Sequence, residues 1–149
     1  MRITFVLPYA GLAGGIKVVA IYTRLLREMG HHVNVVSISR SLSTKQKLRS
    51  LVREKKWLFG SESHGPSHFS VEDPFWTCYG HKGPIKNKHV PDADIIIATW
   101  WKTAEWVHQL DLRKGLKMYL CQGYETHNVT HQKRAEATYR MPLTQICVS

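Results

Sequence analysis

Apolar runs alternate with amphipathic stretches along the chain, and this alternation predicts a mixed α/β fold. Residues 3–9 (ITFVLPY) form a short apolar run, typical of a strand buried on both faces of a parallel sheet. Apolar residues then recur at helical spacing from Val18 to Met29 and stop at Gly30, a favourable residue to end a helix. Residues 32–39 (HVNVVSIS) alternate as a second strand. This strand, helix, strand unit predicts a right-handed crossover between parallel strands.

The second half of the chain continues the pattern. Residues 94–99 (DIIIAT) predict a buried strand, and residues 101–110 predict the helix that follows it. Residues 117–125 and 143–149 predict two more strands. Residues 60–91 lose periodicity, and we expect a long loop there with at most one irregular strand. The expected fold is a Rossmann-like, open, mostly parallel sheet with helices on both faces, and 149 residues suit one domain.

In such sheets ligands bind at the carboxyl ends of the strands, so the loops after Tyr9, Thr99 and Gln122 are the candidate site. Gly14 and Gly15 lie between the first strand and the first helix, where exposed N–H groups favour a phosphate or carboxylate. A tight turn without a ligand is the alternative. The spacing does not match the dinucleotide-binding fingerprint or the P-loop.

Aromatic and polar residues follow the next two strands. Trp100 and Trp101 are adjacent, so both cannot point into one core, and at least one is expected at the crevice, where it suits a sugar or a lipid chain. Packing under a neighbouring loop is the alternative. Gln122, Tyr124 and Glu125 supply groups that bind hydroxyl-rich ligands, although Glu125 could equally cap a loop. The candidate cleft residues are Tyr9, Thr99, Trp100, Trp101, Gln122, Tyr124 and Glu125.

Basic residues are concentrated in residues 44–59. The formal net charge of +10 favours negatively charged partners such as phosphorylated ligands, anionic lipid or nucleic acid. In this segment basic residues surround an apolar helical stripe, which suits docking on an anionic membrane surface, and packing of the stripe on the sheet is the alternative. The candidate membrane-surface residues are Lys45, Lys47, Arg49, Arg53, Lys55, Lys56 and Trp57.

The cysteines indicate the compartment. Cys78, Cys121 and Cys147 are odd in number and widely separated, which fits neither a disulfide framework nor a zinc finger. We therefore expect a reducing, cytoplasmic location. No apolar segment approaches the roughly 18 residues that span a bilayer, so membrane contact would be peripheral, on the inner face.

Two patterns resemble metal sites and are interpreted otherwise. A zinc-like spacing joins His64, His68, Cys78 and His81. No second motif supports it, and a histidine-bearing loop without metal is favoured. Asp92 and Asp94 form an Asp-x-Asp pair, which in some sugar-transferring enzymes holds a metal and a nucleotide-sugar diphosphate. The pair begins a strand, at the edge opposite the ligand crevice, so we expect it to terminate a loop.

Five segments in order resemble a known family: the Gly-Gly pair after strand one, LLREMGHHVNVVS, DADIIIATWWKTAEWV, KMYLCQGYE and TQICVS. Together they resemble the N-terminal half of the retaining glycosyltransferases of family 4, which have the GT-B architecture. The similarity covers nearly the whole chain except residues 40–91.

The resemblance implies an enzyme that moves a hexose from a nucleotide-sugar to a carbohydrate or lipid-linked acceptor, without a metal or another cofactor. It implies that this chain is the N-terminal, acceptor-side domain and that a C-terminal donor-binding domain lies outside it, so the domain alone should be inactive. By the same resemblance the backbone at Gly14 and Gly15 approaches the donor phosphates, while Thr99, Trp100, Gln122 and Tyr124 line the cleft. Many members have a histidine in the loop where this chain has Gln122-Gly123-Tyr124-Glu125.

Two rival functions remain open. The first is a basic nucleic-acid-binding module, but the chain carries no RNP-like, KH or helix-turn-helix signature, and its charge is concentrated in one predicted helix rather than along a sheet face, so we expect no nucleic acid. The second is another Rossmann-like nucleotide-binding module, such as a nicotinamide-dependent enzyme. That class predicts an acidic residue at the end of the second strand, where this chain has serine and arginine.

Overall fold

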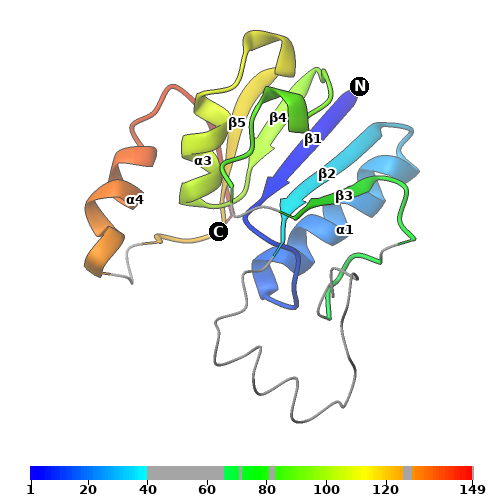
Figure 1. Cartoon of the computed structure of the whole chain (residues 1–149), viewed down its shortest axis with the longest axis horizontal. Coiled ribbons are helices and arrows are strands. Elements are labelled where there is room, and N and C mark those ends of the chain that lie inside the picture. The colour runs from blue at the N-terminus through cyan, green and yellow to red at the C-terminus, as the bar shows by residue number, and fades with distance from the viewer. Residues whose placement is uncertain (40–65, 71, 81–82, 126–128, 149) are drawn as a thin grey trace.

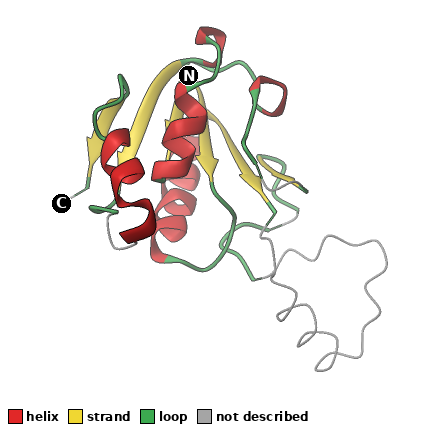
Figure 2. Cartoon of the chain, turned by 60° about the vertical axis from the view of Figure 1, so that its left-hand side comes forward, coloured by secondary structure: helices red, strands yellow, loops and turns green. Residues whose placement is uncertain are grey.

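The chain forms one open, parallel sheet with helices on both faces (Figures 1 and 2). It is described by a computed structural model for residues 1–39, 66–70, 72–80, 83–125 and 129–148. Within these residues the six strands lie in the order β3-β2-β1-β4-β5-β6, and every neighbouring pair is parallel. The predicted Rossmann-like fold class is confirmed.

Strands and helices alternate along most of the described chain. The strands are β1 (Arg2–Leu7), β2 (His32–Ile38), β3 (Trp76–Tyr79), β4 (Ile95–Ala98), β5 (Leu116–Cys121) and β6 (Thr144–Cys147). Among the described residues the helices are α1 (Gly14–Glu28), α3 (Trp101–His108) and α4 (Gln132–Thr138), with short 3-10 turns at Asn87–His89, Leu112–Lys114 and Val129–His131.

The observed elements differ from the predicted ones at β5 and at α4. The expected strand over 117–125 ends at Cys121, because the chain leaves the sheet at Gln122. Strand β3 lies within the expected long loop, where one irregular strand was allowed for, and pairs with β2. Helix α4 was not predicted, since it buries only Ala135 and Thr138 and shows little apolar periodicity.

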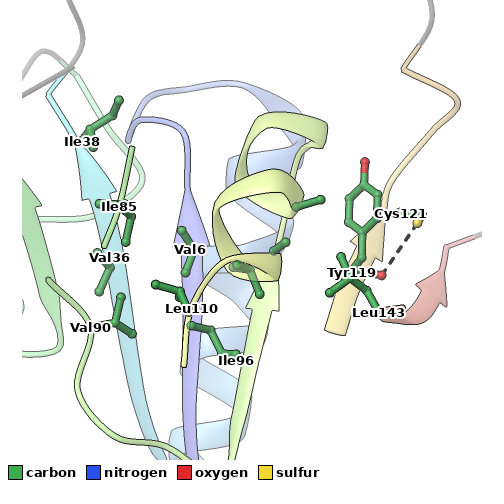
Figure 3. Packing of buried hydrophobic residues seen from close by; sticks show 13 residues of the cluster. Val6, Val36, Ile38, Ile85, Val90, Ile96, Leu110, Tyr119, Cys121 and Leu143 are labelled. Carbon is green, nitrogen blue, oxygen red and sulfur yellow. Dashed lines mark hydrogen bonds between the residues drawn. The ribbon is translucent and has the colours of Figure 1, made fainter. Parts of the chain in front are cut away.

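Strand β1 is buried on both sides because its side chains alternate between two apolar layers. Phe5 and Leu7 face α1, where they pack in one cluster with Val19. Val6 faces the opposite way and shares a second cluster with Val107 of α3 (Figure 3). The nearly continuous apolar run that predicted this strand therefore serves two cores at once.

Ion pairs close the edge of the sheet where the strands begin. Asp94 accepts hydrogen bonds from the backbone N–H of Arg2 at 2.7 Å and from its guanidinium at 3.0 Å. The buried Lys114 ammonium donates to the Asp92 carboxylate at 2.8 Å and to the Val90 carbonyl at 2.7 Å. These hydrogen bonds, with the nearby positive charges, hold the pKa of both carboxyls below the usual value. Both members of the Asp-x-Asp pair thus lie just before β4, at the edge opposite the carboxyl ends of the strands as predicted, and each pairs with a basic side chain.

Gly115 sets the start of β5 against the start of β4. It has a φ of 105°, and a Cβ at this position would lie 2.8 Å from the backbone of Asp94. The next residue, Leu116, donates its N–H to the Asp94 carbonyl at 2.9 Å. Only glycine combines this conformation with so close an approach.

No helix among the described residues is long and apolar enough to cross a membrane. The basic segment 44–59, with its candidate membrane-surface residues, lies outside the described residues and stays a prediction.

Burial on β5 supplies a matched test of the α1-side core. Leu120 is 2% exposed in that core, whereas Leu116 on the same strand is 58% exposed. We expect Leu120→Ala to lower the free energy of unfolding by about 2–5 kcal/mol, through lost burial and the cavity that remains. Leu116→Ala should change it by less than about 0.5 kcal/mol. Urea denaturation of both variants measures the difference, and equal losses would contradict this assignment of the core.

Candidate functional site

A pocket of about 300 Å³ lies where the order of the strands reverses. The chain runs outward from β1 to β2 and β3, and then returns to place β4 on the other side of β1. The loops after β1 and β4 therefore diverge, which leaves a crevice at the carboxyl ends of the strands. We call this the switch-point pocket. Its lining residues are Leu7, Pro8, Tyr9, Ala13, Gly15, Ile16, Thr99, Trp100, Gln122 and Glu125.

The beginning of α1 forms one wall of the pocket. Ala13 precedes the helix and provides no side-chain cap, and the first turn carries no acidic residue. The two glycines that open the helix differ in their surroundings. A Cβ on Gly15 would lie 3.1 Å from Oε1 of Gln122, whereas a Cβ on Gly14 would meet nothing within 4 Å. The bare backbone of Gly15 thus admits the Gln122 side chain, and that of Gly14 faces open space.

The loop after β4 is held rigid by two threonines. The Thr103 hydroxyl accepts the backbone N–H groups of Thr99 and Trp100, both at 2.9 Å, and donates to the Trp100 carbonyl at 2.8 Å. The Thr99 hydroxyl donates to the Val6 carbonyl at 2.9 Å. Thr99 therefore forms part of the pocket floor, with its hydroxyl already bonded to the neighbouring strand.

The tryptophan pair divides between core and pocket. Trp101 is 3% exposed and packs inside, while Trp100 is half-buried and lines the pocket. The Lys102 ammonium lies over the Trp100 ring, 5.3 Å from its centre. This cation–π contact places a positive charge on one face of the ring.

Glu125 closes the pocket and caps α3. Its Oε2 atom accepts the Trp101 N–H at 2.8 Å and the Tyr119 hydroxyl at 3.0 Å. Its own N–H donates to the Tyr139 hydroxyl at 3.0 Å, and that hydroxyl donates to the Gly123 carbonyl. A carboxylate at the N-terminus of a helix is favoured by the helix dipole. Two hydrogen bonds therefore orient the Glu125 side chain, and a third fixes its backbone.

Burial changes the acidity of this group. It raises the pKa of the Glu125 carboxyl, and the hydrogen bonds from Trp101 and Tyr119 only partly oppose the increase. Burial, with the nearby Glu125 charge, also raises the pKa of Tyr119, which thus stays a hydrogen-bond donor. No described residue donates a hydrogen bond to Oε1 of Glu125, the carboxylate oxygen that Trp101 and Tyr119 leave free. That oxygen is available to a ligand hydroxyl.

The structure brings together most, but not all, of the candidate cleft residues. Tyr124 is 63% exposed and packs against the Tyr139 ring at 5.5 Å, outside the pocket lining. Tyr119 and Tyr139, which hold Glu125, were not predicted as site residues. In the sequence Tyr119 is one residue of a predicted strand, and Tyr139 lies fourteen residues beyond Glu125. No sequence pattern near either tyrosine indicates a contact with Glu125.

The described residues contain no group of three or more His, Cys, Asp or Glu side chains that could hold a metal ion. Two members of the zinc-like pattern, His64 and His81, lie outside those residues.

Comparison of the chain with models of protein families, with curated proteins and with solved structures found no match in any of the three.

The two glycines of α1 allow a matched test of the pocket wall. Gly14→Ala should raise the free energy of unfolding by up to about 1 kcal/mol, because alanine favours a helix and nothing obstructs the added methyl group. Gly15→Ala should gain less or lose stability, because the methyl group must displace the Gln122 amide. Thermal unfolding and the NMR shifts of the Gln122 side-chain amide measure both effects. The same outcome for the two variants would rule out the Gly15–Gln122 contact.

Glu125 should make stability depend on pH. Because its pKa is raised above the ordinary 4.5 in the folded state, the folded chain binds this proton more tightly than the unfolded chain. The resulting stabilisation is complete below the unfolded pKa and is lost as the pH rises through the folded pKa. Glu125→Gln keeps an oxygen for the Trp101 N–H and removes the titration. Urea denaturation between about pH 4 and pH 8 should show wild type losing stability relative to this variant, and parallel profiles would contradict the shift.

Proposed function

We propose that the switch-point pocket binds the hydroxyl-rich acceptor of a glycosyltransferase that uses a nucleotide-sugar donor. The observation that carries the proposal is that Trp100, Gln122 and Glu125, from two different loops, line one pocket at the carboxyl ends of the strands. The resemblance of the sequence to family 4 glycosyltransferases supports the same function. The reaction would transfer a hexose to a hydroxyl of a carbohydrate or lipid-linked acceptor.

The chemistry of the lining suits a sugar. The Trp100 ring offers an apolar face, against which the C–H face of a sugar ring packs well. The Gln122 amide both donates and accepts hydrogen bonds, and Oε1 of Glu125 accepts one. At about 300 Å³ the pocket is at the small end of ligand sites, which favours one sugar unit over a whole nucleotide-sugar.

The donor phosphates are assigned to the open end of α1, next to the pocket. The first N–H groups of a helix have no partner within it, and here neither a capping side chain nor an acidic residue competes for them. Gly14 leaves the backbone accessible from outside. In the architecture that the sequence resembles, a second domain would hold the rest of the donor, so this chain alone should bind the donor weakly.

NMR titration of the isotopically labelled chain tests the proposal. Methyl hexosides should shift the signals of Trp100 and the Gln122 side-chain amide, whereas UDP, GDP or ADP sugars should also shift the amide of Gly14. We expect millimolar dissociation constants, about −4 kcal/mol. Shifts of the same residues by NADH or by an RNA oligonucleotide, with none from any sugar, would overturn the proposal in favour of the rival classes.

A pair of glutamine variants tests the role of Gln122. Gln122→Ala removes a neutral hydrogen-bonding group from the pocket, so we expect the dissociation constant of the best hexoside to rise about five-fold. Gln109→Ala is the matched control, because Gln109 is exposed at the far end of α3. The same titration measures both. An unchanged constant for Gln122→Ala, or an equal rise for the control, would remove Gln122 from the site.

A further inference from the structure

Two of the three cysteines are direct neighbours across the edge of the sheet. In the parallel pair of β5 and β6, Cys121 is registered opposite Cys147. Residues opposite each other on paired strands point to the same face, so both thiols lie on the face that α3 covers, where Cys121 packs in one cluster with Tyr119 (Figure 3). Cys78 lies on β3, at the opposite edge of the sheet.

The spacing of the strands permits a bond between these thiols. Neighbouring strands lie about 4.7–4.9 Å apart, within the Cα separation of about 4.4–6.8 Å found in disulfides. The Cβ atoms of a parallel pair are about as far apart as the strands, whereas a disulfide prefers about 3.8 Å. Closing the bond therefore requires a small shift of β6, which is exposed along its length and lies at the edge of the sheet. A strained bond of this kind is readily reduced.

The two thiols differ in how accessible they are. Cys147 is exposed, whereas Cys121 is buried and contacts the Tyr119 carbonyl through its sulfur at 3.7 Å. Burial, with a smaller contribution from the adjacent Cys147 thiol, raises the pKa of Cys121 to about 11. Cys147 is therefore the thiol that a reagent reaches first, and Cys121 is the thiol that resolves the product.

We propose that Cys121 and Cys147 form a reversible disulfide by exchange with a low-molecular-weight disulfide such as oxidised glutathione. The Cys147 thiol loses its proton to water, and the thiolate attacks one sulfur of the reagent, forms a mixed disulfide and expels one thiolate. The Cys121 thiol loses its proton to water in turn, and its sulfur attacks the Cys147 sulfur and expels the second thiolate. The two expelled thiolates take up the two protons from water. The two cysteines are oxidised by two electrons in total, and the reagent is reduced to two thiols.

The bond would tie β6 to the strand that leads into the pocket. Cys121 is the last residue of β5, and Gln122, which lines the pocket, follows it directly. Oxidation would thus act on the edge of the sheet next to the candidate site, whatever that site binds.

Mass spectrometry after incubation in glutathione redox buffers tests this inference. The oxidised chain should lose two alkylatable thiols, weigh less by two hydrogens, and yield a tryptic pair that joins residues 118–133 to residues 141–149. Reduced glutathione should restore both thiols. Cys78→Ser is the matched control and should leave the cross-link unchanged. Cys121→Ser should stop the reaction at a glutathione adduct on Cys147.

Three outcomes would overturn the inference. They are a stable glutathione adduct on Cys147 in the wild-type chain, a cross-link that involves Cys78, or three free thiols in fully oxidised buffer. Hydrogen exchange of the β6 amides is an independent measurement and should slow on oxidation, since the bond restrains an otherwise exposed edge strand.

Discussion

The burial of β1 on both faces is the constraint on which the rest of the domain depends. Its backbone pairs with β2 on one side and β4 on the other, and its side chains alternate between the α1 core and the α3 core. Because β1 has a neighbouring strand on each side, the chain runs from β1 to β2 on one side and later returns to place β4 on the other side. The loops after β1 and β4 therefore diverge, so the pocket is a consequence of how the central strand is buried.

The sequence was sufficient to predict the elements whose side chains are almost all buried. The runs that became β1 and β4 are almost wholly apolar, and this pattern identifies a buried parallel strand without further information. The residues of β3 are only partly buried, because this strand lies at the edge of the sheet, and its short sequence has no clear period. Helix α4 was not predicted at all, since most of its surface is polar and exposed.

The site was predictable in position and less so in detail. The carboxyl ends of parallel strands meet at one edge, so Tyr9, Trp100 and Gln122 could be expected near each other from the strand assignments alone. The contact of Gly15 with Gln122 joins residues more than a hundred positions apart, and the cap that Glu125 provides for α3 runs backwards along the chain. Such contacts depend on how far each loop extends beyond the sheet, which composition and spacing do not encode.

Gly115 has a consequence that reaches well beyond its own turn. Gly115 holds the start of β5 against Asp94. It thereby determines the position of Gln122, about 20 Å away at the other end of β5, relative to Thr99 at the end of β4. The turn before Gly115 therefore influences the shape of the pocket from a distance. A protein engineer who lengthens that turn by two residues could slide β5 against β4 and keep Tyr119 on the α3 side, whereas a slide of one residue would turn every side chain of the strand to the wrong face.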